Sequence, residues 1–220
     1  MDNTSILRHV DHTILTPTAT WSEIEMLCKE ALEFQTASVI VPPCYVKRVR
    51  NAFPTINLGT PIGFPFGYDS TFAKFAEAQY AVEVGADELD MLINLTDVKN
   101  GDFEAIRAEI AAIKAIVGSK ILKVIVEACY LTETEKVALC HVVTDAKADY
   151  IKTSTGLGPG GATIEDIELF KLHVGPNVKL KAAGGIRTGE DMVAFIRVGC
   201  DRIGMSSAIK VLTGDKSEGY

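Results

Sequence analysis

The feature that most constrains the fold is a regular alternation of short apolar runs with amphipathic segments along 220 residues. Eight apolar runs have the length and composition of β-strands: 11–15, 37–41, 57–62, 86–93, 121–127, 149–154, 178–183 and 201–204. Segments with helical periodicity separate them: 20–34, 70–84, 102–117, 132–147, 163–173 and 188–198, with shorter ones after 42 and after 205. Alternating strands and helices imply parallel strands joined by right-handed crossovers.

Eight strand–helix units predict an α/β fold, a single (β/α)8 TIM barrel with a short N-terminal helix. We expect one domain over residues 1–220, because no linker, low-complexity stretch or charge run interrupts the pattern. An open doubly wound sheet is the alternative. It is disfavoured because the first strand is not followed by the glycine pattern of a dinucleotide-binding loop.

Local signals mark individual helices. Thr20, followed three residues later by Glu23, has the pattern of a capping box. Ser70 is a candidate N-cap for the helix over 70–84, in which Phe72, Phe75 and Ala76 are expected to share one face. The helix over 102–117 carries apolar residues at helical spacing: Phe103, Ile106, Ile110, Ile113 and Val117.

Composition and charge exclude several classes of function. A net charge of −7 argues against a nucleic-acid or anionic-membrane surface, and no apolar run is long enough to span a bilayer. The N-terminus lacks a basic-then-apolar signal peptide. Histidines form no metal-binding pattern, and the cysteines form no CxxC pair: Cys28, Cys44, Cys129, Cys140 and Cys200. We expect a cytoplasmic protein with reduced thiols, without a metal, a cofactor, or a nucleic-acid or membrane partner.

Lysines lie at equal intervals in three apolar strand runs, at Lys123, Lys152 and Lys181. An ammonium group in a buried strand is costly unless it is paired or functional. Equal spacing suggests equivalent positions on consecutive strands. The three lysines would then share one cavity, where mutual repulsion makes one of them a usable nucleophile.

The alternation of side chains along a strand extends this prediction. If the faces that carry the lysines point inward, four consecutive strands bring Asp90, Lys123, Lys152 and Lys181 into one cavity. The carboxylate would partly offset the lysines and could handle protons. Lys123 could be either catalytic or structural.

Glycine-rich turns follow the last strands and predict an anion site. Gly184 and Gly185 follow the seventh strand, and Ser206 and Ser207 follow the eighth at the start of a short helix. Backbone N–H groups in such turns bind phosphate in many barrels. The loop over 154–161, with Thr155 and Gly156, could contribute as well.

Other motifs are open to two interpretations. Asp11 and His12 could form a catalytic dyad, but they stand in an apolar strand where a structural role is at least as plausible. The run 63–67 is interpreted first as a tight loop and then as a pocket wall. Cys44 and Cys129 fall near strand ends, which could place them near the site, but buried inert thiols are commoner. Lys179 is expected to be a solvated strand start.

Several strings, in order, resemble the 2-deoxyribose-5-phosphate aldolase family over residues 5–212. They are Asp11–Leu15, Gly63–Pro65, Glu88–Met91, Leu122–Glu127, Tyr150–Gly156, Lys181–Arg187 and Arg202–Ser207. The most specific are the two that contain Lys152 and Lys181. The resemblance implies a class I aldolase with a TIM barrel, no metal and a dimeric assembly.

The resemblance also implies roles for individual residues. Lys152 would be the Schiff-base lysine, Lys181 the neighbouring lysine that tunes it and relays protons, and Asp90 the acid/base partner. Phosphate-binding residues would be Gly184, Gly185, Ser206 and Ser207. Members often end in a tyrosine that reaches the site, which here would be Tyr220.

Two positions depart from the pattern of some relatives. Leu157 stands where some carry a basic residue, which puts the phosphate contact of that loop in question. Val41 stands where some carry a cysteine.

The expected reaction is reversible cleavage of 2-deoxy-D-ribose 5-phosphate to glyceraldehyde 3-phosphate and acetaldehyde, in deoxyribose phosphate catabolism. Lys152 then needs a pKa of about 7 instead of roughly 10.4. We expect repulsion by Lys181 to be the main cause, with partial burial contributing. The alternatives are another phosphate-binding barrel enzyme, such as an isomerase or a transaldolase-like enzyme, and a non-catalytic sugar-phosphate-binding barrel.

Overall fold

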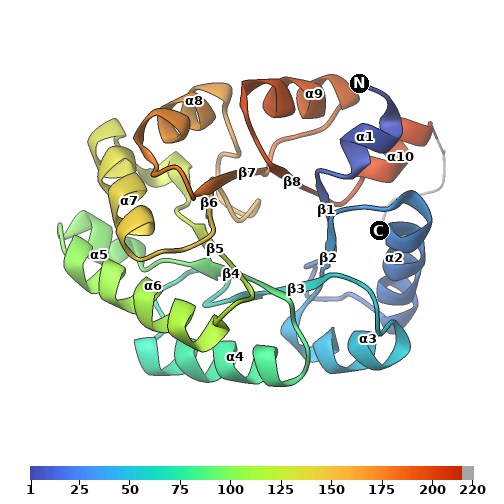
Figure 1. The fold of residues 1–220 in the computed structure, drawn as a ribbon, viewed down its shortest axis with the longest axis horizontal. Coiled ribbons are helices and arrows are strands. Elements are labelled where there is room, and N and C mark those ends of the chain that lie inside the picture. Colours follow the sequence, from blue (N-terminus) through green and yellow to red (C-terminus); the bar gives the residue numbers. More distant parts are fainter. Residues whose placement is uncertain (215–220) are drawn as a thin grey trace.

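A computed structural model describes residues 1–214 and shows a closed barrel of parallel strands in the order β1-β2-β3-β4-β5-β6-β7-β8 (Figure 1). The strands are β1 (Val10–Thr13), β2 (Ser38–Ile40), β3 (Leu58–Ile62), β4 (Glu88–Leu92), β5 (Ile121–Ile125), β6 (Tyr150–Lys152), β7 (Lys179–Ala183) and β8 (Arg202–Met205). The predicted barrel is confirmed. The open-sheet alternative is wrong, because β1 pairs with β8 and leaves no free edge.

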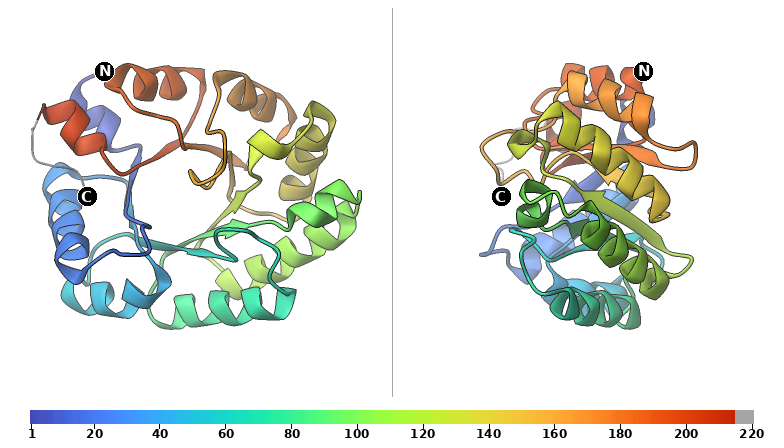
Figure 2. Two further views of the ribbon diagram at one scale, coloured as in Figure 1. Left: turned by 180° about the vertical axis from the view of Figure 1, so that it is seen from behind. Right: turned by 90° about the vertical axis from the view of Figure 1, so that its left-hand side faces the viewer.

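Helices surround the barrel on its outside, as the views in Figure 2 show. They are α1 (Asn3–Leu7), α2 (Trp21–Phe34), α3 (Val46–Ala52), α4 (Thr71–Glu83), α5 (Leu95–Lys99), α6 (Phe103–Val117), α7 (Glu133–Asp145), α8 (Ile164–His173), α9 (Gly189–Val198) and α10 (Ala208–Thr213). Two short 3-10 helices, η1 (Pro43–Tyr45) and η2 (Ala128–Tyr130), follow β2 and β5. The sequence pattern did not predict the short helices α5 and η2, which have five and three residues. Within residues 1–214, every helix is too short or too polar to cross a bilayer.

The helix starts follow the predicted caps, but one helix face does not. Thr20 and Glu23 form the capping box of α2, and the Ser70 side chain accepts from the Ala73 N–H at the start of α4. Phe72, however, is 82% exposed and Ala76 is exposed too, so of the expected face only Phe75 packs against the core. The barrel side of α4 is formed by Lys74, Ala78 and Ala81. Lys74 takes this place because a glutamate on α6 pairs with it.

Alternation along the strands divides apolar from charged side chains. Residues that face the helices form one continuous apolar core and include Val39, Leu58, Leu89, Met91, Leu122, Val124, Ile151, Leu180, Ala182 and Ile203. Intervening positions point into the barrel. Barrel interiors are usually filled by branched apolar residues. Here Asp90 stands beside Lys123, and Lys152 stands beside Lys181 in the strand register. The interior is therefore charged at its centre.

Candidate active site

Asp90, at the middle of β4, receives three lysine ammonium groups. Its Oδ1 lies 2.8 Å from Lys123 Nζ, and its Oδ2 lies 2.8 Å from both Lys152 Nζ and Lys181 Nζ. All four side chains are buried. The structure therefore brings together the four residues that strand alternation placed in one cavity.

A second layer of charge lies on the side of this cluster nearer the strand starts. Lys181 Nζ lies 2.5 Å from Asp11 Oδ2, and Lys123 Nζ lies 2.5 Å from Glu88 Oε2. Arg202 donates to both carboxylates, at 2.5 Å to Asp11 and 3.1 Å to Glu88. These roles of Glu88 and Arg202 were not predicted from the sequence. The available signal was strand parity, because Glu88 shares the inward face of β4 with Asp90.

Lys152 differs from its neighbours in its balance of charges. Its one ion pair among the described residues is with Asp90 Oδ2, an oxygen that Lys181 also contacts. Burial, followed by the like charge of Lys181, lowers the pKa of Lys152 from its ordinary 10.5 to about 8, against the opposing effect of Asp90. The expectation that repulsion by Lys181 is the main cause is wrong, because burial contributes more. An amine with this pKa is partly neutral near pH 7 and can attack a carbonyl carbon.

The other members of the cluster keep their charges. Burial alone would lower the pKa of Lys123, but Asp11, Asp90 and Glu88 hold it well above its usual value. Burial alone would raise the pKa of Asp90, but Lys123, Lys152 and Lys181 hold it well below its usual value. Lys123 is thus a permanent cation with three carboxylate partners, which fits a structural role better than that of a nucleophile.

A cavity of about 380 Å³ opens above Lys152, at the carboxyl ends of the strands. It is lined by Thr13, Ile14, Leu15, Thr16, Pro17, Phe64, Lys152, Thr155, Gly156, Leu157, Ala183, Gly184, Gly185, Ile186, Gly204, Met205, Ser206 and Ser207. Every residue that the sequence analysis placed in a phosphate site is in this set. A volume of this size accepts a small phosphorylated metabolite.

Close packing of glycines shapes the wall of this cavity. Gly184 has φ +77°, and a Cβ there would lie 3.1 Å from the Cα of Gly156 and 3.2 Å from that of Gly161. Any larger residue would force the loop after β6 away from the loop after β7. Because these glycines have no side chains, we expect the backbone N–H groups of both loops to be able to approach an anion.

The remaining predicted site residues have mixed outcomes. Asp11 and His12 do not form a dyad, because Asp11 points into the barrel while His12 Nε2 contacts Glu30 at 2.9 Å. The 63–67 loop is a pocket wall, since Phe64 lines the cavity. Tyr220 lies outside the described residues.

Two cysteines and one lysine were also singled out in the sequence. Cys44 and Cys129 are exposed, not buried, and neither lines the cavity. Lys179 is exposed at the start of β7, as predicted.

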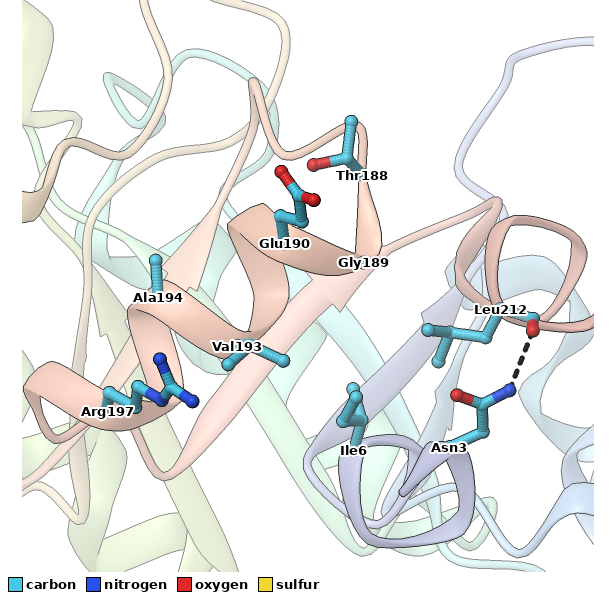
Figure 3. Close-up of a pocket in the computed structure, with 9 residues that line it drawn as sticks. All are labelled: Asn3, Ile6, Thr188, Gly189, Glu190, Val193, Ala194, Arg197 and Leu212. Atoms are coloured by element: carbon cyan, nitrogen blue, oxygen red, sulfur yellow. Dashed lines mark hydrogen bonds between the residues drawn. The ribbon is translucent and has the colours of Figure 1, made fainter. Parts of the chain in front are cut away.

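A larger hollow of about 800 Å³ lies on the outer surface between α9, α1 and α10 (Figure 3). Its apolar lining includes Ile6, Val193 and Leu212, and its charged lining residues are Glu190 and Arg197. It is separate from the lysine cluster, and its lining contains no lysine, cysteine or serine. The smaller cavity is therefore the candidate active site.

Metal binding has no prepared site in residues 1–214, where His, Cys, Asp and Glu side chains form no group of three or more suited to an ion. The buried carboxylates of the barrel already accept hydrogen bonds from lysine and arginine side chains.

Comparison with known proteins agrees with this geometry. Residues 5–213 match the model of the DeoC/LacD family of aldolases. The chain belongs to the DeoC/LacD aldolase family. It is 55% identical to a deoxyribose-phosphate aldolase of Clostridium botulinum (strain Alaska E43 / Type E3), with 100% of both chains covered. It is 51% identical to a deoxyribose-phosphate aldolase of Clostridioides difficile (strain 630), over 98% of this chain and 99% of the relative.

Among solved structures, the deoxyribose phosphate aldolase from Aeropyrum pernix superposes with a TM-score of 0.90 at 32% identity. The match covers 98% of this chain and 93% of that one. Membership of the DeoC/LacD aldolase family confirms the resemblance drawn from the motifs around Lys152 and Lys181.

Proposed function

We propose that this protein reversibly cleaves 2-deoxy-D-ribose 5-phosphate to glyceraldehyde 3-phosphate and acetaldehyde through a Schiff base on Lys152. The observation that carries the proposal is a buried lysine with a pKa lowered to about 8 that lines a cavity walled by glycine turns. Full-length relatives that are 55% and 51% identical carry the name of this activity, which supports the same conclusion.

Lys152 supplies the nucleophile. Its neutral Nζ adds to the C1 carbonyl of the open-chain sugar, and loss of water leaves an iminium ion. Cleavage of the C2–C3 bond sends its electron pair into the iminium, while the C3 hydroxyl loses its proton to a base. Glyceraldehyde 3-phosphate leaves, and the enamine takes a proton at C2. Hydrolysis then releases acetaldehyde and restores the amine.

Asp90 and Lys181 are placed to handle the protons of these steps. Asp90 remains ionised at neutral pH and touches both amines through one oxygen. Lys181 contacts Asp90 on one side and Asp11 on the other, so it can pass a proton without leaving the carboxylates. Together with a water in the cavity, this pair would form the proton relay. Lys123 supports Asp90 from its other oxygen.

The phosphate would bind at the far wall of the cavity from Lys152. Backbone N–H groups of Gly184, Gly185, Ser206 and Ser207 provide the donors there, and the loop with Thr155 and Gly156 closes the same wall. Leu157 adds no charge to it, so the amides carry most of the recognition. We expect Tyr220 to assist from the C-terminus.

Incubation with deoxyribose 5-phosphate and coupled detection of glyceraldehyde 3-phosphate tests the proposal. Borohydride should inactivate the protein only when substrate is present, with the adduct on Lys152 in a peptide map. Release of a different product would favour an isomerase or a transaldolase-like enzyme, and ligand binding without turnover would favour a non-catalytic barrel. An adduct on Lys123 or Lys181 would overturn the assignment of the nucleophile.

We also propose a cytoplasmic homodimer that has a sugar phosphate as its ligand and no nucleic-acid or membrane partner. The net charge of −7 supports the last part. The Aeropyrum pernix relative is described as tetrameric, so the assembly differs within the family if the dimer is correct. Light scattering coupled to size-exclusion chromatography gives the mass, and a tetramer or a monomer would contradict the proposed dimer.

A further inference from the structure

The charged interior is one ion-pair network of seven side chains. Its cations are Lys123, Lys152, Lys181 and Arg202, and its carboxylates are Asp11, Glu88 and Asp90. With every group ionised, the network carries one surplus positive charge. It is neutral when one lysine gives up its proton. A buried network favours the neutral total, because an uncompensated charge away from water is costly.

Arg202 joins this network at the end opposite the cavity. It begins β8, as Glu88 begins β4, and its guanidinium bridges two carboxylates. Nη1 lies 2.5 Å from Asp11 Oδ1, and Nη2 lies 3.1 Å from Glu88 Oε1. Ser38 and Asn57 donate to the same two carboxylates, at 2.8 Å and 2.7 Å. Arg202 is absent from the cavity lining, so a bound substrate does not touch it.

Arg202 also decides how the carboxylates are shared. Asp11 and Glu88 form ion pairs with Arg202, Lys123 and Lys181. Asp90 is then shared among the three lysines of the network. Burial would lower the pKa of Arg202, but Asp11 and Glu88 hold it above its usual value, so it never gives up its charge. Within the network, Lys152 alone has a single ion-pair partner, Asp90 Oδ2. Lys181 contacts the same oxygen.

We propose that Arg202 is a positioning residue for catalysis: as a fixed cation on Asp11 and Glu88, it makes Lys152 the surplus cation that sheds its proton. The idea rests on the proposed role of Lys152 as nucleophile and extends it to a side chain outside the cavity. A structural role alone would predict lower stability without a displaced pH profile. The proposed role predicts a displaced profile with a sign.

The sign follows from the charge balance. In Arg202→Met the network holds three cations and three carboxylates with Lys152 protonated, so the ammonium form is favoured and the pKa of Lys152 rises. In Glu88→Gln the surplus of positive charge grows, and the pKa of Lys152 falls. We expect shifts of about half to one pH unit in opposite directions, because each lost charge acts on Lys152 only through intervening ion pairs. Glu88 reaches Asp90 through Lys123, and Arg202 reaches it through Asp11 and Lys181.

The groups that face Lys152 belong to three strands: Asp90 on β4, Lys123 on β5 and Lys181 on β7. Those that face Arg202 are Asp11 on β1, Glu88 on β4 and the ring of Tyr150 on β6, 5.8 Å away. Every one of these groups is kept in Arg202→Met, and all but Glu88 are kept in Glu88→Gln. The two variants therefore change one charge each.

Competitive labelling of Lys152 with an amine-acylating reagent across pH 6–11, read by peptide mass mapping, measures its pKa without turnover. The acidic limb of kcat/KM for deoxyribose 5-phosphate gives the same quantity during catalysis. Arg202→Lys keeps the positive charge but loses the two-pronged guanidinium. The acidic limb of its kcat/KM profile should therefore stay near the wild-type position. Arg197→Met, an exposed arginine of α9, is the matched control and should leave both measurements unchanged.

Opposite displacements in Arg202→Met and Glu88→Gln support the proposal. Two unmoved limbs, or two displacements of the same sign, overturn it and leave Arg202 a structural residue. If Arg202→Met does not fold by circular dichroism, Glu88→Gln and Arg202→Lys decide the question alone. If wild-type protein does not cleave deoxyribose 5-phosphate, the proposed function fails while the labelling result still tests Arg202.

Discussion

Two lysines in this molecule are buried to a similar degree and serve different ends. Lys74, on α4, has no exposed side-chain surface and lies 2.9 Å from Glu109 of α6. Lys152, on β6, is 5% exposed and lies 2.8 Å from Asp90. The other oxygen of Glu109 accepts a hydrogen bond from the Thr71 hydroxyl at 2.8 Å, and among residues 1–214 no second cation pairs with this carboxylate. Lys152 must share Asp90 with two other lysines.

The contrast shows that burial alone does not make a lysine a nucleophile. Lys74 is sealed between two helices and the loop at Gly63, where a Cβ would lie 2.8 Å from its Cε, so no substrate can reach it. Lys152 lines a cavity, and its pKa falls to about 8 because burial is only partly compensated by a shared carboxylate. Access and an unbalanced count of charges together distinguish Lys152, the proposed nucleophile, from Lys74.

Replacing Lys152 tests the largest expected difference between the two sites. Lys152→Met removes the group that we propose forms the Schiff base, so kcat should fall by on the order of 10⁶-fold, as when other covalent enzymes lose their nucleophile. Borohydride should trap no substrate adduct. The coupled aldolase assay and mass mapping measure both effects. Residual turnover within about tenfold of wild type would exclude Lys152 as the nucleophile.

The same variant should not lose stability. Because the folded pKa of Lys152 lies at about 8, below its ordinary 10.5, the unfolded chain binds the proton more readily between these values. Wild-type stability should therefore rise as pH increases from about 8 to 10.5 and be lowest below that window. Lys152→Met lacks the buried charge and should be as stable as wild type or more so at pH 7. Urea unfolding at pH 7 and pH 10 measures the difference.

Lys74→Met should show the reverse behaviour. Methionine keeps the apolar stem against Gly63 but leaves Glu109 buried without a cation. Breaking one partner of a buried pair costs roughly 3–5 kcal/mol in unfolding free energy. The folded fraction should keep its kcat. Lys74→Met combined with Glu109→Leu should recover part of the loss, because no lone charge remains. Full stability in the single variant would show that the pair contributes nothing.

Much of the barrel was predictable from local patterns because each strand and helix carries its own signal. Eight apolar runs and capping residues such as Thr20 and Ser70 mark the elements, and alternation along the strands placed Asp90 with the lysines. The rest depends on contacts far apart in the chain. Arg202 meets Asp11 across 191 positions, and Lys74 turns inward only because Glu109 lies opposite. No local pattern contains such pairs, which is why Phe72 was wrongly predicted to lie on a packed face of α4.

Lys181 sharpens the comparison by changing the surroundings of Lys152 and not Lys152 itself. Lys181→Met removes the second largest cause of its lowered pKa while leaving burial in place. The acidic limb of kcat/KM should move to higher pH by about one unit, which corresponds to a loss of about tenfold at neutral pH. Activity should return in part at alkaline pH.

Incomplete recovery at alkaline pH would show that Lys181 also relays protons. Lys179→Met, at an exposed position of the same strand, is the matched control and should not move the limb. A slow Lys181→Met variant with an unmoved limb would mean that Lys181 acts in proton transfer alone.

A comparison of two buried carboxylates, Glu127 and Glu109, gives the smallest expected effect on activity. Like Glu109, Glu127 is nearly inaccessible, but its partner is a backbone group: both carboxylate oxygens lie 3.2 Å from the Thr155 N–H. Its left-handed backbone, with φ +51°, turns the side chain toward the loop that walls the proposed phosphate end of the cavity. Glu127 is therefore expected to position Thr155 and Gly156 without touching substrate.

Glu127→Gln keeps an oxygen acceptor and removes the charge, so one hydrogen bond is weakened by about 0.5–1.5 kcal/mol. KM for deoxyribose 5-phosphate should rise by roughly twofold to tenfold with little change in kcat, since Lys152 and Asp90 are undisturbed. Free deoxyribose, which lacks the phosphate, should show no comparable rise, and this ratio separates loop positioning from a general loss of structure. A fall in kcat for both sugars alike would instead place Glu127 with Glu109, as a carboxylate that only holds the barrel together.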